Sequence, residues 1–81
     1  LILSYITDME NKDYVLAAQR TKEIRNKYGG AELARKLGVS HAAVSKWKVI
    51  PPFRAYQIAQ LGDYELEYIR PDINFNVGQQ P

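Results

Sequence analysis

Two short segments with apolar residues at helical spacing meet at a glycine within residues 30–48. In the first segment, the apolar residues between positions 33 and 37 share one face of a helix and the charged residues share the other, which predicts an amphipathic helix of about two turns. Gly38 follows, at the place where a chain leaving a helix often turns left-handed. Ser40 comes next, where its side chain can cap the free backbone donors of a second helix. The pattern predicts two short helices joined by a tight turn.

The second helix of this pair is predicted over residues 40–48. Val44 and Trp47 lie three residues apart on one face, and the other positions carry short or polar side chains that leave an outward face free of bulk. The core of the pair is expected to comprise Leu33, Ala34, Leu37, Gly38, Val39, Val44 and Trp47. This is the pattern of a helix-turn-helix, whose second helix enters the major groove of DNA. A structural helical hairpin that never contacts DNA uses similar small residues.

The segment before the pair predicts an arm followed by a helix. Residues 1–6 have the pattern of a short apolar strand or an irregular arm, and Thr7–Glu10 has the spacing of a capping box that starts a helix. Asn11 and Asp13 are alternative starts. From Tyr14 a helical pattern continues to Tyr28 without glycine or proline, and Gly29–Gly30 ends it.

The segment after the pair predicts two more helices. Prolines break the chain within residues 49–52, because the residue before a proline avoids helical geometry. One helix is predicted over residues 52–61, since proline suits a first helical turn, and a shorter one over residues 64–69, which Pro71 stops. The polar residues 74–81 predict a flexible tail.

These elements predict an all-α chain of 81 residues with a single small core. Residues 1–16 form an N-terminal arm that is a candidate dimerisation element. Residues 17–73 form the helix-turn-helix domain, and residues 74–81 form the tail.

Positive charge is concentrated in the middle of the chain. The net charge of the whole chain is only +2. Residues 17–48 carry eight Lys and Arg against two acidic residues, a net charge of +6, while residues 1–16 and residues 49–81 each carry −2. Such a distribution suits a surface that displaces counterions from phosphates.

Composition argues against several other classes of protein. Without cysteine the chain has neither disulfides nor a thiolate zinc site, and no nucleophile stands in a recognisable catalytic motif, so we expect no enzyme activity. Three acidic residues at alternate positions, Asp63, Glu65 and Glu67, do not converge on one metal ion, and we expect no metal site and no cofactor. No segment reaches the length of a membrane span, which predicts a cytoplasmic protein associated with the nucleoid.

Residues 38–48, followed by Ile50-Pro51 and Ala55-Tyr56, resemble the all-helical Cro repressors of lambdoid phages and the related YdaS-like prophage regulators. Arg70-Pro71-Asp72 is similar to the end of YdaS-like domains. The resemblance extends over residues 24–72 and implies a compact five-helix, lambda-repressor-like domain, preceded here by an apolar arm or an extra helix. It also implies binding to operator DNA as a dimer on an inverted repeat, and control of a phage or prophage promoter.

The resemblance implies two sets of DNA contacts. The residues expected to face base edges are Ser40, His41, Ala42, Ser45 and Lys46. A lysine can donate to guanine acceptors and an alanine methyl can meet a thymine methyl. The residues expected at phosphates are Gly30 and Ala31, through their backbone N–H groups, together with Lys48 and Arg54. A solvent-exposed residue without a role is an equal alternative for His41, and Arg35 and Lys36 are expected to be solvated.

The expected partners are double-stranded operator DNA and further copies of this chain, as a homodimer or a higher homo-oligomer, with no membrane and no small-molecule substrate. The apolar arm motivates the second partner, since an uncovered apolar edge needs burial. Its candidate contacts are Leu1, Leu3, Tyr5 and Ile6. Two alternatives stay open: the arm folds back on its own domain, or the chain is an antitoxin-like or assembly module of a prophage toxin–antitoxin locus in which protein contacts dominate.

Overall fold

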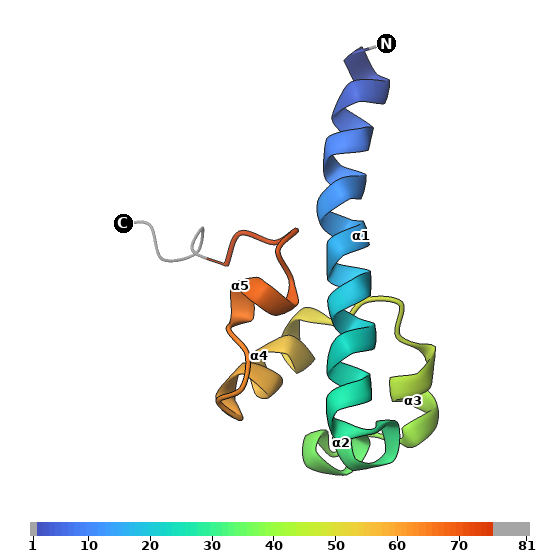
Figure 1. Ribbon diagram of the computed structural model, residues 1–81, viewed down its shortest axis with the longest axis vertical. Helices are drawn as coiled ribbons and strands as arrows, with labels where there is room; N and C mark the ends of the chain where they lie inside the picture. Colours follow the sequence, from blue (N-terminus) through green and yellow to red (C-terminus); the bar gives the residue numbers. More distant parts are fainter. Residues whose placement is uncertain (1, 76–81) are drawn as a thin grey trace.

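The structure is a computed structural model that describes the backbone of residues 2–75 and the side chains of residues 12–75. Over this range the chain forms five helices and no strand. The helices are α1 (Ile2–Tyr28), α2 (Gly30–Leu37), α3 (His41–Lys46), α4 (Pro52–Gln60) and α5 (Leu66–Ile69). In Figure 1, α1 runs the length of the molecule, α2 lies across its C-terminal end, and α3 stands on the opposite side of α1 from α4 and α5. The predicted all-α fold of five helices is confirmed.

The N-terminal segment is helical, so the strand or irregular arm expected for residues 1–6 is wrong from Ile2 onward. The capping box at Thr7–Glu10 does not start a helix either, because it lies inside α1. Extending an existing helix costs less than nucleating a new one, and no glycine or proline interrupts the chain before Gly29. Leu1 lies outside the described residues, and for residues 2–11 only the backbone is described.

A single apolar core joins the helices. Its fully or nearly fully buried members are Ile24, Leu33, Ala34, Leu37, Val44, Ile50, Ala55, Ile58 and Ile69. Of the seven residues expected in the core of the helix-turn-helix, four belong to this set, and Val39 and Trp47 pack against it while half-buried. The expectation is wrong for Gly38, which is exposed because it forms the turn between the two helices. Because α2 and α3 contribute only short apolar faces, neither is stable alone: α3 packs mainly on α2, and α2 packs in turn on α1 and α4.

The turn between α2 and α3 is built by the two residues that mark it in the sequence. Gly38 adopts a left-handed conformation with φ of 74°, and the N–H of Val39 donates to the carbonyl of Ala34 at 3.0 Å, which closes the end of α2. The Ser40 hydroxyl oxygen accepts the N–H of Ala43 at 3.0 Å and so caps α3. The turn thereby fixes how α3 leaves α2.

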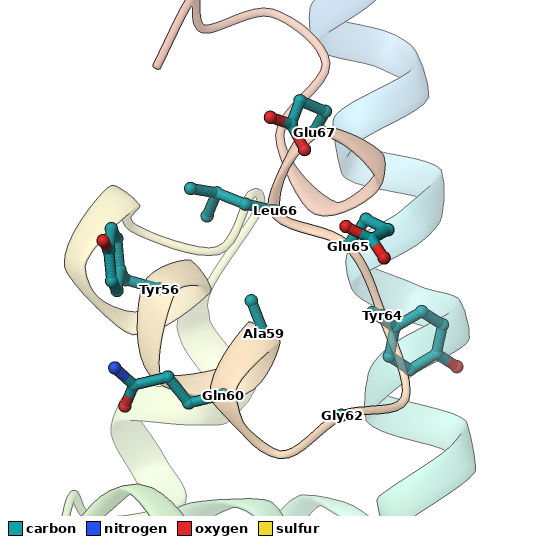
Figure 2. A pocket seen from close by; sticks show the side chains of 8 residues that line it. All are labelled: Tyr56, Ala59, Gln60, Gly62, Tyr64, Glu65, Leu66 and Glu67. Carbon is teal, nitrogen blue, oxygen red and sulfur yellow. The ribbon is translucent and has the colours of Figure 1, made fainter. Parts of the chain in front are cut away.

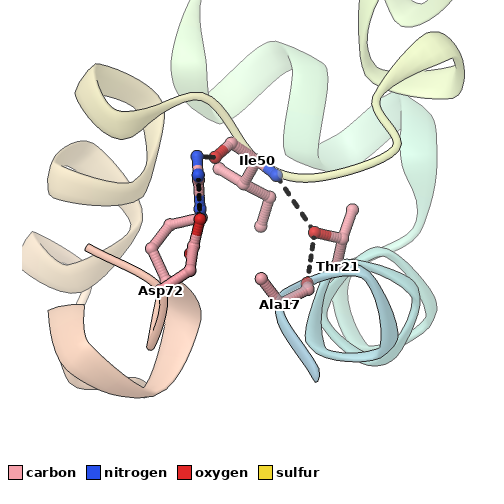
Figure 3. A network of polar contacts seen from close by, with 5 residues as sticks. Ala17, Thr21, Ile50 and Asp72 are labelled. Carbon is pink, nitrogen blue, oxygen red and sulfur yellow. Dashed lines mark hydrogen bonds and ion pairs between the residues drawn. The ribbon is translucent and has the colours of Figure 1, made fainter. Parts of the chain in front are cut away.

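The segment between α3 and α4 is held by polar groups from both ends of the domain (Figure 3). The buried Thr21 hydroxyl of α1 donates to the carbonyl of Ala17 at 2.9 Å and accepts the N–H of Ile50 at 3.0 Å. The carbonyl of Ile50 accepts a hydrogen bond from Nη1 of Arg70 at 2.7 Å. Arg70 also forms a bidentate pair with Asp72, with distances of 2.8 and 2.7 Å, and this pair lowers the pKa of Asp72 although partial burial opposes the shift. Both backbone groups of the buried Ile50 are therefore satisfied.

Aromatic side chains join α1 to the α5 region. Tyr68 stacks on Tyr64 with ring centroids 5.7 Å apart, and its hydroxyl donates to Glu23 at 2.7 Å. Tyr28 donates to Asp63 at 2.7 Å, and burial followed by this hydrogen bond raises the pKa of Tyr28 to about 12. Arg20 covers the Tyr68 ring at 3.6 Å. Arg20, one of the eight cations within residues 17–48, is therefore engaged by the protein itself.

Helices α4 and α5 differ slightly from their predicted bounds. α4 ends at Gln60 rather than Leu61, and α5 begins at Leu66, so Tyr64 precedes it. None of the helices in the described part of the chain is long and apolar enough to cross a membrane.

Candidate nucleic-acid interface

Helix α3 has one buried face and one exposed face. Val44 is fully buried and Trp47 half-buried, while all five residues expected at base edges are exposed: Ser40, His41, Ala42, Ser45 and Lys46. Positions 41, 42, 45 and 46 follow the spacing of one helical face. Within residues 12–75, the side chains of His41, Ser45 and Lys46 form no hydrogen bond or ion pair with the protein. This face therefore presents hydrogen-bond donors and acceptors that have no partner in the described part of the chain, next to the small methyl group of Ala42.

Gly30 and His41 meet at the start of α2. A Cβ atom on Gly30 would lie 2.7 Å from Nε2 of His41, so the imidazole rests against the first residue of α2. Gly29, at the N-cap, offers no side chain to the free N–H groups of this first turn. The positive end of the α2 dipole and the His41 ring therefore share one place on the surface. The structure brings together three of the predicted DNA contacts: Gly30, Ala31 and His41.

Lys48 and Arg54 occupy different environments. The recognition helix, expected over residues 40–48, ends at Lys46, because Trp47 adopts an extended conformation, and Lys48 lies in the bend beyond it. Lys48 is exposed, with Nζ 5.9 Å from the Tyr14 ring centroid. Arg54 is half-buried and donates to Gln57 Oε1 at 2.7 Å and to the last carbonyl of α2, that of Leu37, at 3.4 Å. Lys48 is thus free to reach a phosphate, whereas Arg54 is partly committed to the fold.

The structure divides the cations of residues 17–48 into two groups. The arginines contact protein groups: Arg20 contacts Tyr68, Arg25 binds backbone carbonyls, and Arg35 pairs with Glu32. Lys36 lies 3.9 Å from the same Glu32. The other lysines, Lys22, Lys27, Lys46 and Lys48, are exposed and form no ion pair within residues 12–75. These lysines are the cations most available to phosphates.

The sequence did not indicate a role for Arg25. Its Nη1 donates to the carbonyls of Val44 at 3.2 Å and Trp47 at 3.0 Å, at the C-terminal end of α3. In the sequence Arg25 stands among mixed charges on a helix, and a solvated side chain fits that pattern equally well. The one local signal is its position four residues after Thr21, which places both on adjacent turns of α1.

A hollow of about 380 Å³ lies between α4 and the start of α5 (Figure 2). Its lining includes Tyr56, Ala59 and Leu66, with the carboxylates of Glu65 and Glu67 at its edge. Like charge repels phosphate, so the acidic edge disfavours DNA at this surface. The charge distribution favours the surface of α3 and the start of α2 for nucleic acid.

Comparison with known proteins identifies the family of the chain. The family described as DNA-binding transcriptional regulator Cro matches residues 20–77, which include the last turns of α1 and all of α2 to α5. No curated protein and no solved structure matches the chain. The family match covers well over half of the chain and contains the whole helix-turn-helix. The chain therefore belongs to the Cro family of phage-type, DNA-binding transcriptional regulators.

Proposed function

We propose that this regulator is a sequence-specific repressor that reads operator DNA through the exposed face of α3. The observation that carries the proposal is the division of this helix: Val44 is fully buried, while His41, Ser45 and Lys46 are exposed and have no partner among the described side chains. A helix anchored by one face and free on the other can enter a major groove without disturbing its domain.

The chemistry of the outward face suits base edges. Lys46 can donate to O6 and N7 of guanine, and the methyl group of Ala42 can pack on a thymine methyl. Ser45 is short and serves as donor or acceptor. Because these groups are small, one copy has few strong contacts, and we expect specificity to depend on two copies bound to an inverted repeat.

Phosphate contacts are proposed on both sides of that face. The backbone N–H groups of Gly30 and Ala31 can hold one phosphate at the start of α2, with the His41 imidazole beside it. Lys48 supplies a second contact after α3. Arg54 is a weaker candidate than Lys48, because its guanidinium already donates to Leu37 and Gln57.

A homodimer through the N-terminal half of α1 completes the proposal. In Figure 1 this half extends beyond the other helices, and the family match begins only at residue 20. The candidate contacts remain Leu1, Leu3, Tyr5 and Ile6. A helix that projects from its domain gains burial when it packs on a second copy.

The experiment that tests the proposal is selection of labelled duplexes from random DNA by the full-length protein at low salt. We expect an enriched inverted repeat, bound with an affinity that falls steeply as salt rises. A promoter carrying that repeat should lose expression when the protein is present. If no sequence is enriched, the repressor assignment is wrong, and an assembly role dominated by protein contacts becomes the better explanation.

A further inference from the structure

The C-terminal end of α3 needs support from outside the helix. α3 has only six residues, fewer than an isolated helix needs in water. Its last carbonyls lack the regular partner four residues further on, and among backbone donors the Val44 carbonyl accepts only the N–H of Trp47, the residue that ends the helix, at a long distance of 3.3 Å. Ser40 fixes the start of the helix, but no side chain within α3 fixes its end.

Arg25 supplies this support from α1. One guanidinium nitrogen, Nη1, lies 3.2 Å from the carbonyl oxygen of Val44 and 3.0 Å from that of Trp47. Hydrogen bonds from a charged donor are stronger than neutral ones, and a cation at a helix C-terminus complements the helix dipole. The side chain is half-buried, and its donors point at the backbone of α3.

Thr21 extends the same support by one turn of α1. It is 1% exposed, and its hydroxyl oxygen accepts the N–H of Ile50 at 3.0 Å. Two consecutive turns of α1 therefore hold the chain from Val44 to Ile50, where it leaves the recognition helix. The direction of α3 is set by contacts outside the helix-turn-helix as well as within it.

We infer that Arg25 is a positioning residue for base recognition, which acts by fixing the end of α3 rather than by contacting DNA. The inference rests on the proposed function, since it assigns Arg25 to the helix that we propose reads bases. It predicts that losing the Arg25 contacts weakens discrimination between DNA sequences while sequence-independent binding to phosphates persists.

Three variants separate positioning from charge. Arg25→Lys keeps the positive charge but replaces the planar guanidinium with a single ammonium. Arg25→Met removes the charge and both hydrogen bonds. Lys27→Met removes one charge from the same helix at an exposed position, with no hydrogen bond to α3 among the described side chains, and is the matched control. Each is compared with the natural sequence on the duplex selected from random DNA and on a scrambled duplex of equal composition, over a range of salt concentrations.

We expect Arg25→Lys and Arg25→Met to lower the ratio of specific to non-specific affinity by about tenfold, the scale of one charge-assisted hydrogen bond. Arg25→Lys should keep the salt dependence of non-specific binding, and Lys27→Met should keep the affinity ratio. If Arg25→Lys retains the full ratio, and Arg25→Met only reduces the salt slope by about one, then Arg25 is a phosphate contact and the inference is overturned.

Amide hydrogen exchange in the free protein tests the positioning without DNA. We expect the amides of Ser45, Lys46 and Trp47 to exchange about tenfold faster in Arg25→Met, while those of the Ile58 region keep their protection. Unchanged protection of α3 would overturn the inference even if DNA discrimination fell. If the natural protein selects no sequence, the proposed function fails, and the exchange data still decide whether Arg25 holds α3.

Discussion

Gly30 shows how one missing side chain shapes the proposed interface. It is the first residue of α2 and does not have positive φ, so its backbone could belong to any residue. A side chain there would meet the His41 ring, because a Cβ atom at this position would lie 2.7 Å from Nε2. The imidazole of His41 therefore occupies the space that a side chain at position 30 would need, and its position depends on glycine at position 30.

Replacing Gly30 with alanine separates binding from stability. Alanine favours a helix by up to about 1 kcal/mol over glycine, so the free energy of unfolding should not decrease. DNA affinity should fall several-fold, because the methyl group displaces the imidazole from the start of α2. Urea unfolding and DNA titration measure the two effects. In a His41→Ala background the same substitution should leave affinity unchanged, and a persistent loss there would mean that Gly30 acts without His41.

Lys46 and Lys48 should respond differently to removal. Lys46→Ala should alter the preferred sequence, because its proposed partner is a base edge, whereas Lys48→Ala should weaken binding to all sequences. Lys48→Ala should also reduce the slope of log affinity against log salt by about one. Repeating the random-duplex selection and the salt titration with both variants tests this. Identical effects of the two variants would contradict the assignment of separate roles.

At the scale of elements, the parts of the fold that the sequence predicted are those fixed by neighbours in the chain. Gly38 and Ser40 act on groups within a few residues, so the turn between α2 and α3 was visible in the pattern. The start of α1 was not, because helix extension from a packed segment overrode the local capping signal. The support given by Arg25 and Arg70 was not visible either, since their partners lie 19 to 22 residues away in the chain.

The pair of Arg70 and Asp72 makes the α3–α4 segment sensitive to acid. The folded-state pKa of Asp72 is lowered by its hydrogen bonds to Arg70, so its stabilisation is present above the unfolded pKa of about 4 and is lost as pH falls through the folded value. Asp72→Asn should cost about 2 kcal/mol at pH 7, because Arg70 is 7% exposed and loses its charged partner.

Urea unfolding at pH 7 and pH 3 measures this effect. The difference in unfolding free energy between the natural protein and Asp72→Asn should shrink at pH 3, because this pH lies below the unfolded pKa of about 4 and the unfolded chain then gains a proton at Asp72. Glu67→Gln, at an exposed carboxylate, is the control and should have little effect at either pH. A difference that stays constant with pH would show that the charge of Asp72 is not responsible.

At the scale of the whole molecule, one long helix connects the packed domain to an end that projects from it. The C-terminal half of α1 belongs to the core through Ala17, Thr21 and Ile24, and it carries the support for α3. The N-terminal half projects beyond α5 in Figure 1. Deleting residues 1–11 removes neither the core residues nor the Arg25 contacts, so the domain should still fold.

This deletion tests the proposed dimer. Light scattering of the full chain should give the mass of a dimer, and the shortened chain should give that of a monomer. Thermal unfolding of the shortened chain checks that the domain is intact. Its affinity for a single half-site should match that of the full chain, whereas its affinity for the inverted repeat should fall, because a linked pair of sites gains effective concentration. An unchanged mass would refute a role for the arm in assembly.

The outward face of α3 also has an evolutionary consequence. Since Ala42, Ser45 and Lys46 lie on the outward side of the helix and hold no other part of the described chain in place, substitutions there should change folding stability by less than about 0.5 kcal/mol. The side chains on this face can thus vary independently of the residues that hold the fold together. If this face reads bases as we propose, a lineage of such regulators can acquire new operators by single substitutions, each intermediate remaining folded, and laboratory selection can follow the same route with a library confined to three codons.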